Sequence, residues 1–131
     1  MEVFELYIRT HFSAAHALKG YMGECANVHG HNWIIDVFVR CDRLNHIGIG
    51  MDFKDIKQAV NDVLKSEDET LRLDHANLGD HPAFADINPT SEHIARYIYK
   101  ELGKRINGEG VRISKINVSE TPGAGACYWE E

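Results

Sequence analysis

The sequence predicts an α+β domain in which two helices cover one face of a four-stranded antiparallel sheet. Two long stretches near the amino terminus alternate apolar and polar residues, as β-strands do. Two amphipathic helical patterns follow, and two further strand-like stretches come last, so the expected order is β-β-α-α-β-β. Because strands and helices are segregated along the chain, we expect an α+β layer rather than a parallel α/β sheet.

The first predicted strand covers residues 3–16, which are rich in β-branched and aromatic side chains. The second covers about residues 32–41. Its apolar positions alternate, and they are Trp33, Ile35, Val37 and Val39. We expect the two strands to form a long antiparallel pair joined by the loop of residues 19–28.

Both predicted helices have capping residues ahead of an apolar stripe. Asp52 is the expected N-cap of the first helix, and the polar residues 66–70 end it. Its stripe has helical spacing and consists of Phe53, Ile56, Val60, Val63 and Leu64. Residues 88–92 supply a Pro and capping hydroxyls for the second helix, and residues 107–110 end it. Its stripe consists of Ile94, Ala95, Ile98, Leu102 and Ile106.

The last two predicted strands, residues 111–120 and 126–130, are separated by a turn at residues 122–125. The 131 residues suit a single domain, which we expect to cover residues 1–131. A four-stranded sheet has two open edges, and proteins often protect such edges by joining subunits. We therefore expect a homo-oligomer.

Composition and charge exclude several classes of protein. The formal net charge of −6 argues against a general nucleic-acid binder, which needs clustered Lys and Arg. We see no apolar run near the length of a membrane span and no signal-peptide pattern at the start. The three cysteines are odd in number and widely spaced, which suits free thiols in a reducing compartment. We therefore expect a cytoplasmic protein with no membrane or nucleic-acid partner.

A His-Gly-His sequence carries the strongest chemical signal. His29 and His31 are alternate residues of a strand, so they project from the same face and can hold one ion together. His16 lies near the end of the expected partner strand, within reach of both. Three neutral imidazoles suit Zn²⁺ and leave one coordination position open, which is typical of a catalytic site. The alternative, unrelated surface histidines, is disfavoured by the third histidine.

Cys25 lies four residues before His29, and its spacing leaves three interpretations open. A nearby cation can stabilise its thiolate, which would make it a reactive group. Cys with three His is also a known structural zinc set, so Cys25 could be a fourth ligand. Burial as an inert thiol is the third interpretation.

Two carboxylates also have chemical potential. Asp74 precedes His75, and such a pair can tune proton transfer near neutral pH, although an Asp capping a turn is the commoner arrangement. Glu120 ends a predicted strand and could accept two hydrogen bonds from an amidine-like ligand edge, or simply be solvated. The remaining histidines show no pattern, and we interpret them as surface or helix-cap residues: His11, His46, His81 and His93.

Five motifs together resemble the 6-pyruvoyl tetrahydropterin synthase family, in order and spacing. They are Cys25 to His31 (CANVHGH), Gly50 to Phe53 (GMDF), Leu73 to His75 (LDH), Asn88 to Glu92 (NPTSE) and Ser119 to Thr121 (SET). The short gap between Cys25 and His29 is similar to the bacterial branch, 6-carboxytetrahydropterin synthase of the queuosine pathway. The biopterin branch usually has a longer gap.

The resemblance implies the tunnelling fold, in which three subunits close their sheets into a barrel and two such trimers stack as a hexamer. It implies that His16, His29 and His31 bind Zn²⁺, as the residues alone suggest. It implies that Cys25 is the proton-abstracting thiol and that Asp74 and His75 are its relay partners.

By the same resemblance, Glu120 anchors the pyrimidine ring of a pterin, helped by backbone groups near Thr90 and Ser91. The implied substrate is 7,8-dihydroneopterin triphosphate. The implied products are 6-carboxytetrahydropterin, acetaldehyde and triphosphate. Two alternatives are 6-pyruvoyl tetrahydropterin synthase, which retains the side-chain carbons, and a non-catalytic zinc-dependent binding module. A pure binding module has no chemical need for the thiol of Cys25.

Overall fold

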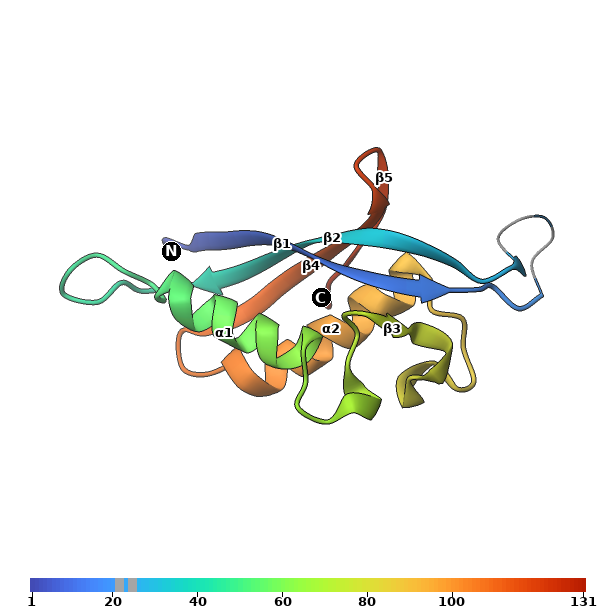
Figure 1. Ribbon diagram of the computed structural model, residues 1–131. Coiled ribbons are helices and arrows are strands. Elements are labelled where there is room, and N and C mark those ends of the chain that lie inside the picture. Colours follow the sequence, from blue (N-terminus) through green and yellow to red (C-terminus); the bar gives the residue numbers. More distant parts are fainter. Residues whose placement is uncertain (21–22, 24–25) are drawn as a thin grey trace.

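A long antiparallel hairpin forms the centre of the fold. In the computed structural model, residues 1–20, 23 and 26–131 are described. Strand β1 (Phe4–His16) pairs with β2 (His29–Cys41) along its whole length, from Phe4 opposite Cys41 to His16 opposite His29. The predicted pairing is therefore confirmed. Figure 1 shows this hairpin running across the molecule above both helices.

The sheet has five strands, in the order β3-β1-β2-β4-β5, where four were predicted. The additional strand β3 (Ala76–Asn77) pairs in parallel with β1 at Ala14 and Ala15, which makes the sheet mixed. A strand of two residues is too short to show any periodicity, and its pairing depends on a tertiary contact. The predicted strand count and all-antiparallel pairing were therefore wrong, whereas the α+β class is confirmed.

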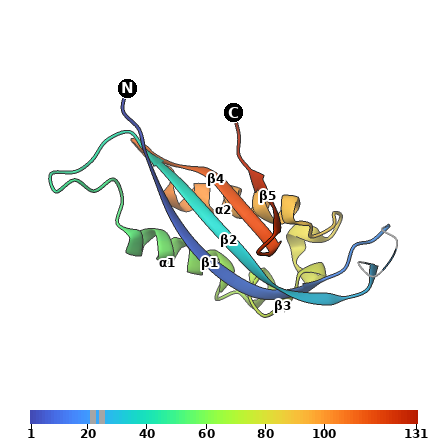
Figure 2. The same ribbon diagram turned by 90° about the horizontal axis from the view of Figure 1, so that it is seen from above.

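Both helices lie on one face of the sheet, as Figures 1 and 2 show. Helix α1 (Phe53–Leu64) is capped by Asp52, whose side chain accepts from the N–H of Lys54. Helix α2 (Ser91–Ile106) is capped by Thr90, and its buried residues include the whole predicted stripe. Phe53 is the exception in the first stripe, because it is 51% exposed at the first position of α1.

The closing hairpin consists of β4 (Val111–Thr121) and β5 (Ala124–Tyr128). Thr121 pairs with Ala124, so the turn contains only Pro122 and Gly123 and β5 begins two residues before its predicted start. β4 also pairs with β2. The core lies between sheet and helices, and the alternating residues of β2 from Trp33 to Val39 are fully buried there.

The segment between the helices contains three short 3₁₀ helices, Glu69–Leu71, Leu78–Asp80 and Pro82–Phe84. His81 caps the last of these, since its Nδ1 accepts from the N–H of Ala83 at 3.0 Å. His81 is buried rather than exposed, because its ring packs against Phe84 and Tyr97. Of the two alternatives predicted for this histidine, a surface or a helix-cap position, the helix-cap position is the one observed.

The opposite face of the sheet carries a polar network. Arg9 donates two hydrogen bonds to Asp36, at 2.7 and 3.1 Å, and Asn117 donates a third at 3.2 Å. The hydrogen bonds from Arg9 lower the pKa of Asp36. Among the described cysteines, Cys41 is buried, Cys127 is exposed, and both are free thiols. In the described part of the chain, neither helix has the length and apolar character needed to cross a membrane.

Candidate functional site

Three histidines meet at the end of the β1–β2 hairpin. His16 lies directly opposite His29 in the strand register, and His31 lies two residues further along the same face of β2. One ring nitrogen from each imidazole can be chosen so that all three lie within 4.8 Å of one another. The predicted cluster of His16, His29 and His31 is therefore brought together by the sheet itself.

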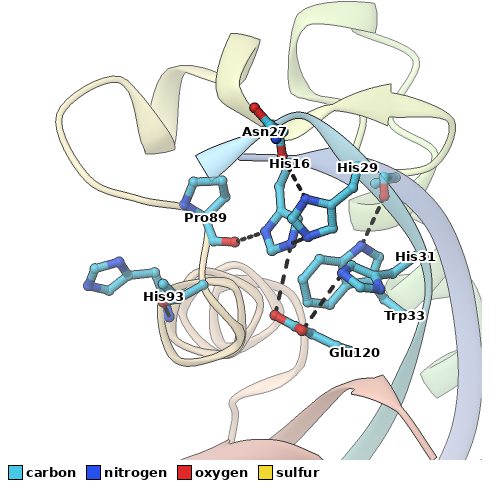
Figure 3. Close-up of polar contacts among 10 residues, drawn as sticks. His16, Asn27, His29, His31, Trp33, Pro89, His93 and Glu120 are labelled. Atoms are coloured by element: carbon cyan, nitrogen blue, oxygen red, sulfur yellow. Dashed lines mark hydrogen bonds and ion pairs between the residues drawn. The ribbon is translucent and has the colours of Figure 1, made fainter. Parts of the chain in front are cut away.

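Backbone carbonyl groups fix the tautomers of two of these rings (Figure 3). Nδ1 of His16 lies 2.8 Å from the carbonyl oxygen of Pro89, and Nδ1 of His29 lies 2.7 Å from that of Asn27. A carbonyl oxygen only accepts hydrogen bonds, so each Nδ1 carries the proton. In a neutral imidazole the other nitrogen, Nε2, is then bare and offers a lone pair.

The bare nitrogens point toward one another. Nε2 of His16 and Nε2 of His29 are 3.0 Å apart, close to the separation of about 3.3 Å that two nitrogen ligands of tetrahedral zinc have. Nε2 of His31 is buried without a hydrogen-bond partner among the described residues. Facing lone pairs repel unless a cation or a shared proton lies between them, so this donor set fits a metal ion.

Burial supports the same conclusion. His16 is 1% exposed, and this burial lowers its pKa, so the ring is neutral and able to act as a ligand. The indole of Trp33 packs edge-on against His16 and His31, with ring centroids 4.8 and 5.2 Å away. Its Nε1 donates to the carbonyl oxygen of Ala14, which fixes the indole plane. The histidines therefore have little rotational freedom.

Glu120 lies beside the cluster, with its carboxylate directed toward His16 and His31, as Figure 3 shows. Its carboxylate oxygens lie 3.9 Å from Nε2 of His16 and 3.7 Å from Nε2 of His31. The side chain is 37% exposed, so it reaches both the cluster and solvent. From this position a carboxylate can accept hydrogen bonds from a bound molecule or approach the metal ion itself.

Asp74 and His75 form the predicted pair, with Oδ2 of Asp74 2.9 Å from Nδ1 of His75. Burial by itself would raise the pKa of Asp74. The hydrogen bonds from the N–H of Ser13 and from His75 outweigh it and hold that pKa below its ordinary value. Asp74 is thus an ionised carboxylate that orients the imidazole, an arrangement suited to proton transfer.

The backbone of His75 is unusual. Its φ of 58° makes it the sole non-glycine residue with positive φ in the part of the chain that the structure describes. Its N–H donates to the carbonyl oxygen of Ser13, which keeps the residue in this conformation. Strained backbone of this kind is frequent at functional sites. The imidazole itself is 78% exposed.

The remaining candidates lie near the beginning of α2 and in the loop before β2. Thr90 uses its hydroxyl to cap α2, accepting from the N–H of His93 at 3.2 Å, and Ser91 is buried in the first turn. Both follow Pro89, the residue that holds His16. Cys25 lies outside the described residues, so its three interpretations stay open on geometry.

Sequence reasoning missed the groups that orient the ligands. The carbonyl oxygens of Asn27 and Pro89 are backbone atoms, which no residue pattern reveals. Trp33 was recognised as a core residue, and the strand period does place it on the same face as His31. The contact of Trp33 with the cluster could have been predicted from this shared face.

The fold and the cluster together define an α+β protein with a site that can hold a metal ion. The chain belongs to the 6-pyruvoyl tetrahydropterin synthase family, whose family model matches residues 5–131. Members of this family include pterin synthases, enzymes that eliminate triphosphate in a lyase-type reaction. A pterin substrate is therefore consistent with the family.

Individual relatives are named for different activities. A 6-carboxy-5,6,7,8-tetrahydropterin synthase of Synechocystis sp. is 35% identical, covering 95% of this chain and 92% of the relative. A dihydroneopterin monophosphate aldolase of Pyrococcus furiosus is 34% identical, covering 86% and 85%. The structure of 6-pyruvoyl tetrahydropterin synthase from Caenorhabditis elegans superimposes with a TM-score of 0.84 at 27% identity, covering 100% of this chain and 98% of that one.

Proposed function

We propose that this chain is a zinc-dependent 6-carboxy-5,6,7,8-tetrahydropterin synthase. It would convert 7,8-dihydroneopterin triphosphate and water to 6-carboxytetrahydropterin, acetaldehyde and triphosphate, in the synthesis of the 7-deazaguanine precursor of queuosine. The observation that carries the proposal is the cluster of His16, His29 and His31, with bare imidazole nitrogens and Glu120 beside it. Several relatives named for this activity, including the Synechocystis protein, support the choice of reaction.

Zinc is the metal that three neutral imidazoles and an open position suit best. When bound, it supplies Lewis-acid stabilisation of the negative charge that develops on side-chain oxygens of the substrate. The protein's part is to keep His16 and His29 in the tautomers that leave Nε2 free, through the carbonyl oxygens of Pro89 and Asn27. Trp33 keeps the rings in place.

Glu120 is proposed to bind the pterin ring. The pyrimidine half of a pterin presents a guanidine-like edge with two N–H groups, and a carboxylate can accept from both. Glu120 reaches the open side of the cluster, so a ring held there directs its side chain toward the histidines. Backbone groups near Thr90 and Ser91 are proposed to complete this subsite.

Cys25 is proposed as the base and His75 as the acid. The thiolate of Cys25 removes a proton from a side-chain carbon next to the developing carbonyl, and His75 returns a proton to the pterin ring. Asp74 is already ionised and bonded to Nδ1 of His75, so it holds the imidazole in one orientation.

We propose that a second copy of the chain completes the site. The imidazole of His75 projects into solvent at 78% exposure, which suits a group that acts in a cavity formed with a neighbouring subunit. We propose that the assembly is a hexamer, a dimer of trimers, as the family resemblance implies. We further propose a single domain over residues 1–131 and a cytoplasmic location.

The reaction products distinguish this activity from the activities of related enzymes. Incubation of the zinc-loaded protein with dihydroneopterin triphosphate should give 6-carboxytetrahydropterin and trapped acetaldehyde by mass spectrometry. A product that retains the three-carbon side chain, without acetaldehyde, would show a 6-pyruvoyl tetrahydropterin synthase, the activity named for the Caenorhabditis elegans structure. Turnover of dihydroneopterin monophosphate alone would favour the activity named for the Pyrococcus furiosus relative.

A further inference from the structure

The side chain of Asn88 clamps the chain just beyond β1. Its Oδ1 accepts from the N–H of Lys19 at 2.9 Å, and its Nδ2 donates to the carbonyl oxygen of Lys19 at 2.9 Å. One amide group thus satisfies both backbone groups of a residue 69 positions away in sequence. Asn88 is half-buried and lies outside every helix and strand, so this pairing serves no sheet or helix.

The backbone beside this clamp holds a proposed metal ligand. The carbonyl oxygen of Pro89, the next residue, accepts from Nδ1 of His16 at 2.8 Å. His16 is three residues before Lys19, so the clamp and the imidazole bond connect the same two segments at neighbouring points. Movement of Pro89 away from His16 is therefore opposed by both bonds of the amide.

The other side of the same segment is fixed to α2. The carbonyl oxygen of Asn88 accepts from Nδ1 of His93 at 2.6 Å and from the N–H of Thr90 at 2.9 Å. Thr90 in turn caps the helix. Residues 88–90 are thus attached to the rigid helix on one side and to the end of β1 on the other.

We propose that Asn88 is a positioning residue for the metal centre. Its amide sets the distance between α2 and the end of β1, so that the carbonyl of Pro89 meets Nδ1 of His16 and leaves Nε2 aimed at the metal. This proposal rests on the proposed metal-binding function, and it extends the metal site to Asn88.

Loss of the clamp should weaken metal binding without unfolding the chain. Removal of outer partners of metal-bound histidines typically lowers metal affinity about 10- to 100-fold. We expect the lower end, about tenfold, for Asn88→Ala, because Asn88 acts through the carbonyl of Pro89. Zinc affinity would be measured by competition with a chromogenic chelator, and folding by circular dichroism.

Two control variants match Asn88→Ala. Lys19→Ala retains both clamp bonds, since only backbone groups of Lys19 take part, and should leave zinc affinity within twofold of wild type. Asn45→Ala removes a loop asparagine whose Oδ1 accepts from two backbone N–H groups, those of Ile47 and Ile49. That loop follows Cys41, at the opposite end of the β1–β2 hairpin from His16 and His29, so zinc affinity should again be unchanged.

A second variant covers the possibility that Asn88→Ala does not fold. Asn88→Asp has the same shape and retains the acceptor for the N–H of Lys19, but loses the donor to its carbonyl. The added negative charge by itself would favour a cation, so a lower zinc affinity would report the lost clamp. In the cobalt-loaded protein, the visible absorption bands should shift in Asn88→Asp but not in Asn45→Ala, because the ligand geometry changes.

Two different results would overturn the role of Asn88 and the proposed function separately. A folded Asn88→Ala or Asn88→Asp protein with wild-type zinc affinity and an unshifted cobalt spectrum would overturn the role of Asn88. Failure of the wild-type protein to bind zinc at all would instead overturn the proposed function.

Discussion

The three-histidine cluster and the Asp74–His75 pair are both built around imidazoles, but in opposite ways. The cluster is held inside one chain: His16 is buried, two Nδ1 atoms are fixed by carbonyl oxygens, and Trp33 packs against the rings. His75 is 78% exposed, on backbone with a φ of 58°. The sheet register, with the carbonyl oxygens of Asn27 and Pro89, completes the first region inside the chain, whereas the second presents its imidazole to solvent.

Strand β1 supports both regions through different residues. His16, at its end, belongs to the cluster, while the N–H of Ser13 donates to Asp74 and the carbonyl oxygen of Ser13 accepts from the N–H of His75. These two bonds hold His75 in a conformation that costs on the order of 1 kcal/mol or more. Because the two regions use different residues, a substitution in one should change metal binding without changing proton transfer, and the reverse.

The largest expected effect separates the two regions directly. His29→Ala should lose its bound zinc. Its turnover should fall by a factor of about a thousand or more, since metal-ion stabilisation of charge is worth several kcal/mol. His75→Ala should retain zinc and lose activity about 100- to 10,000-fold, the range of general acid–base catalysis. Both variants are checked by measuring their zinc content by elemental analysis and their turnover. Loss of zinc from His75→Ala would erase the distinction.

The second prediction tests whether the proton-transfer region acts across subunits. Cys25→Ala and His75→Ala should each retain zinc and be inactive. Mixed with subunit exchange, the two proteins should recover activity at about a quarter of the sites, those that combine an intact thiol with an intact neighbouring imidazole. Recovery is measured as turnover after mixing. An active monomer by light scattering, or no recovery despite proven exchange, would contradict a shared site.

Glu120 lies beside the cluster, and its substitution tests whether it binds the substrate or the metal ion. Glu120→Gln should retain zinc and raise the substrate KM about 10- to 100-fold, because a charge-assisted pair of hydrogen bonds to the pterin edge is lost. Steady-state kinetics and metal content are the measurements. If the variant loses its zinc instead, Glu120 is a metal ligand, as its distances of 3.7 and 3.9 Å to imidazole nitrogens would also allow.

The smallest expected effect is a pH dependence of stability from His81, outside both regions. Burial lowers its pKa below the ordinary 6.5. The unfolded chain therefore binds more protons, and this contribution to stability is lost as pH falls below 6.5 toward the lowered pKa. Protonation of Nδ1 also removes the acceptor for Ala83.

Chemical denaturation of the metal-free protein between pH 7.5 and 5.5 tests this effect. His81→Asn, whose amide oxygen can still accept from Ala83, should lose less stability on acidification than wild type. His46→Asn, in an exposed loop, is the matched control and should follow the wild type. An identical pH dependence in His81→Asn and wild type would contradict the assignment to His81.

Much of the three-histidine cluster could be predicted from the sequence because strand alternation is a local rule. The period of two placed His29 and His31 on one face, and the hairpin brought His16 opposite. The helices were found through their caps and stripes, with Asp52 and Thr90 as the observed N-caps. Short-range patterns of this kind require no knowledge of the tertiary structure.

Other features depended on contacts between distant segments. Strand β3 exists only because residues 76–77 lie against β1. The positive φ of His75 is imposed by Ser13, 62 positions earlier in the chain, and burial of His81 by packing against Tyr97. None of these leaves a periodic signal, so each required the structure.

Anomalous diffraction at the zinc edge, on crystals of the protein as purified, tests the metal centre most directly. We predict one zinc ion per chain, about 2.0–2.1 Å from Nε2 of each of His16, His29 and His31, with the fourth position open to water or substrate. No anomalous peak after zinc reconstitution would contradict a zinc enzyme. A peak with Cys25 as a fourth protein ligand would contradict the catalytic site and indicate a structural one.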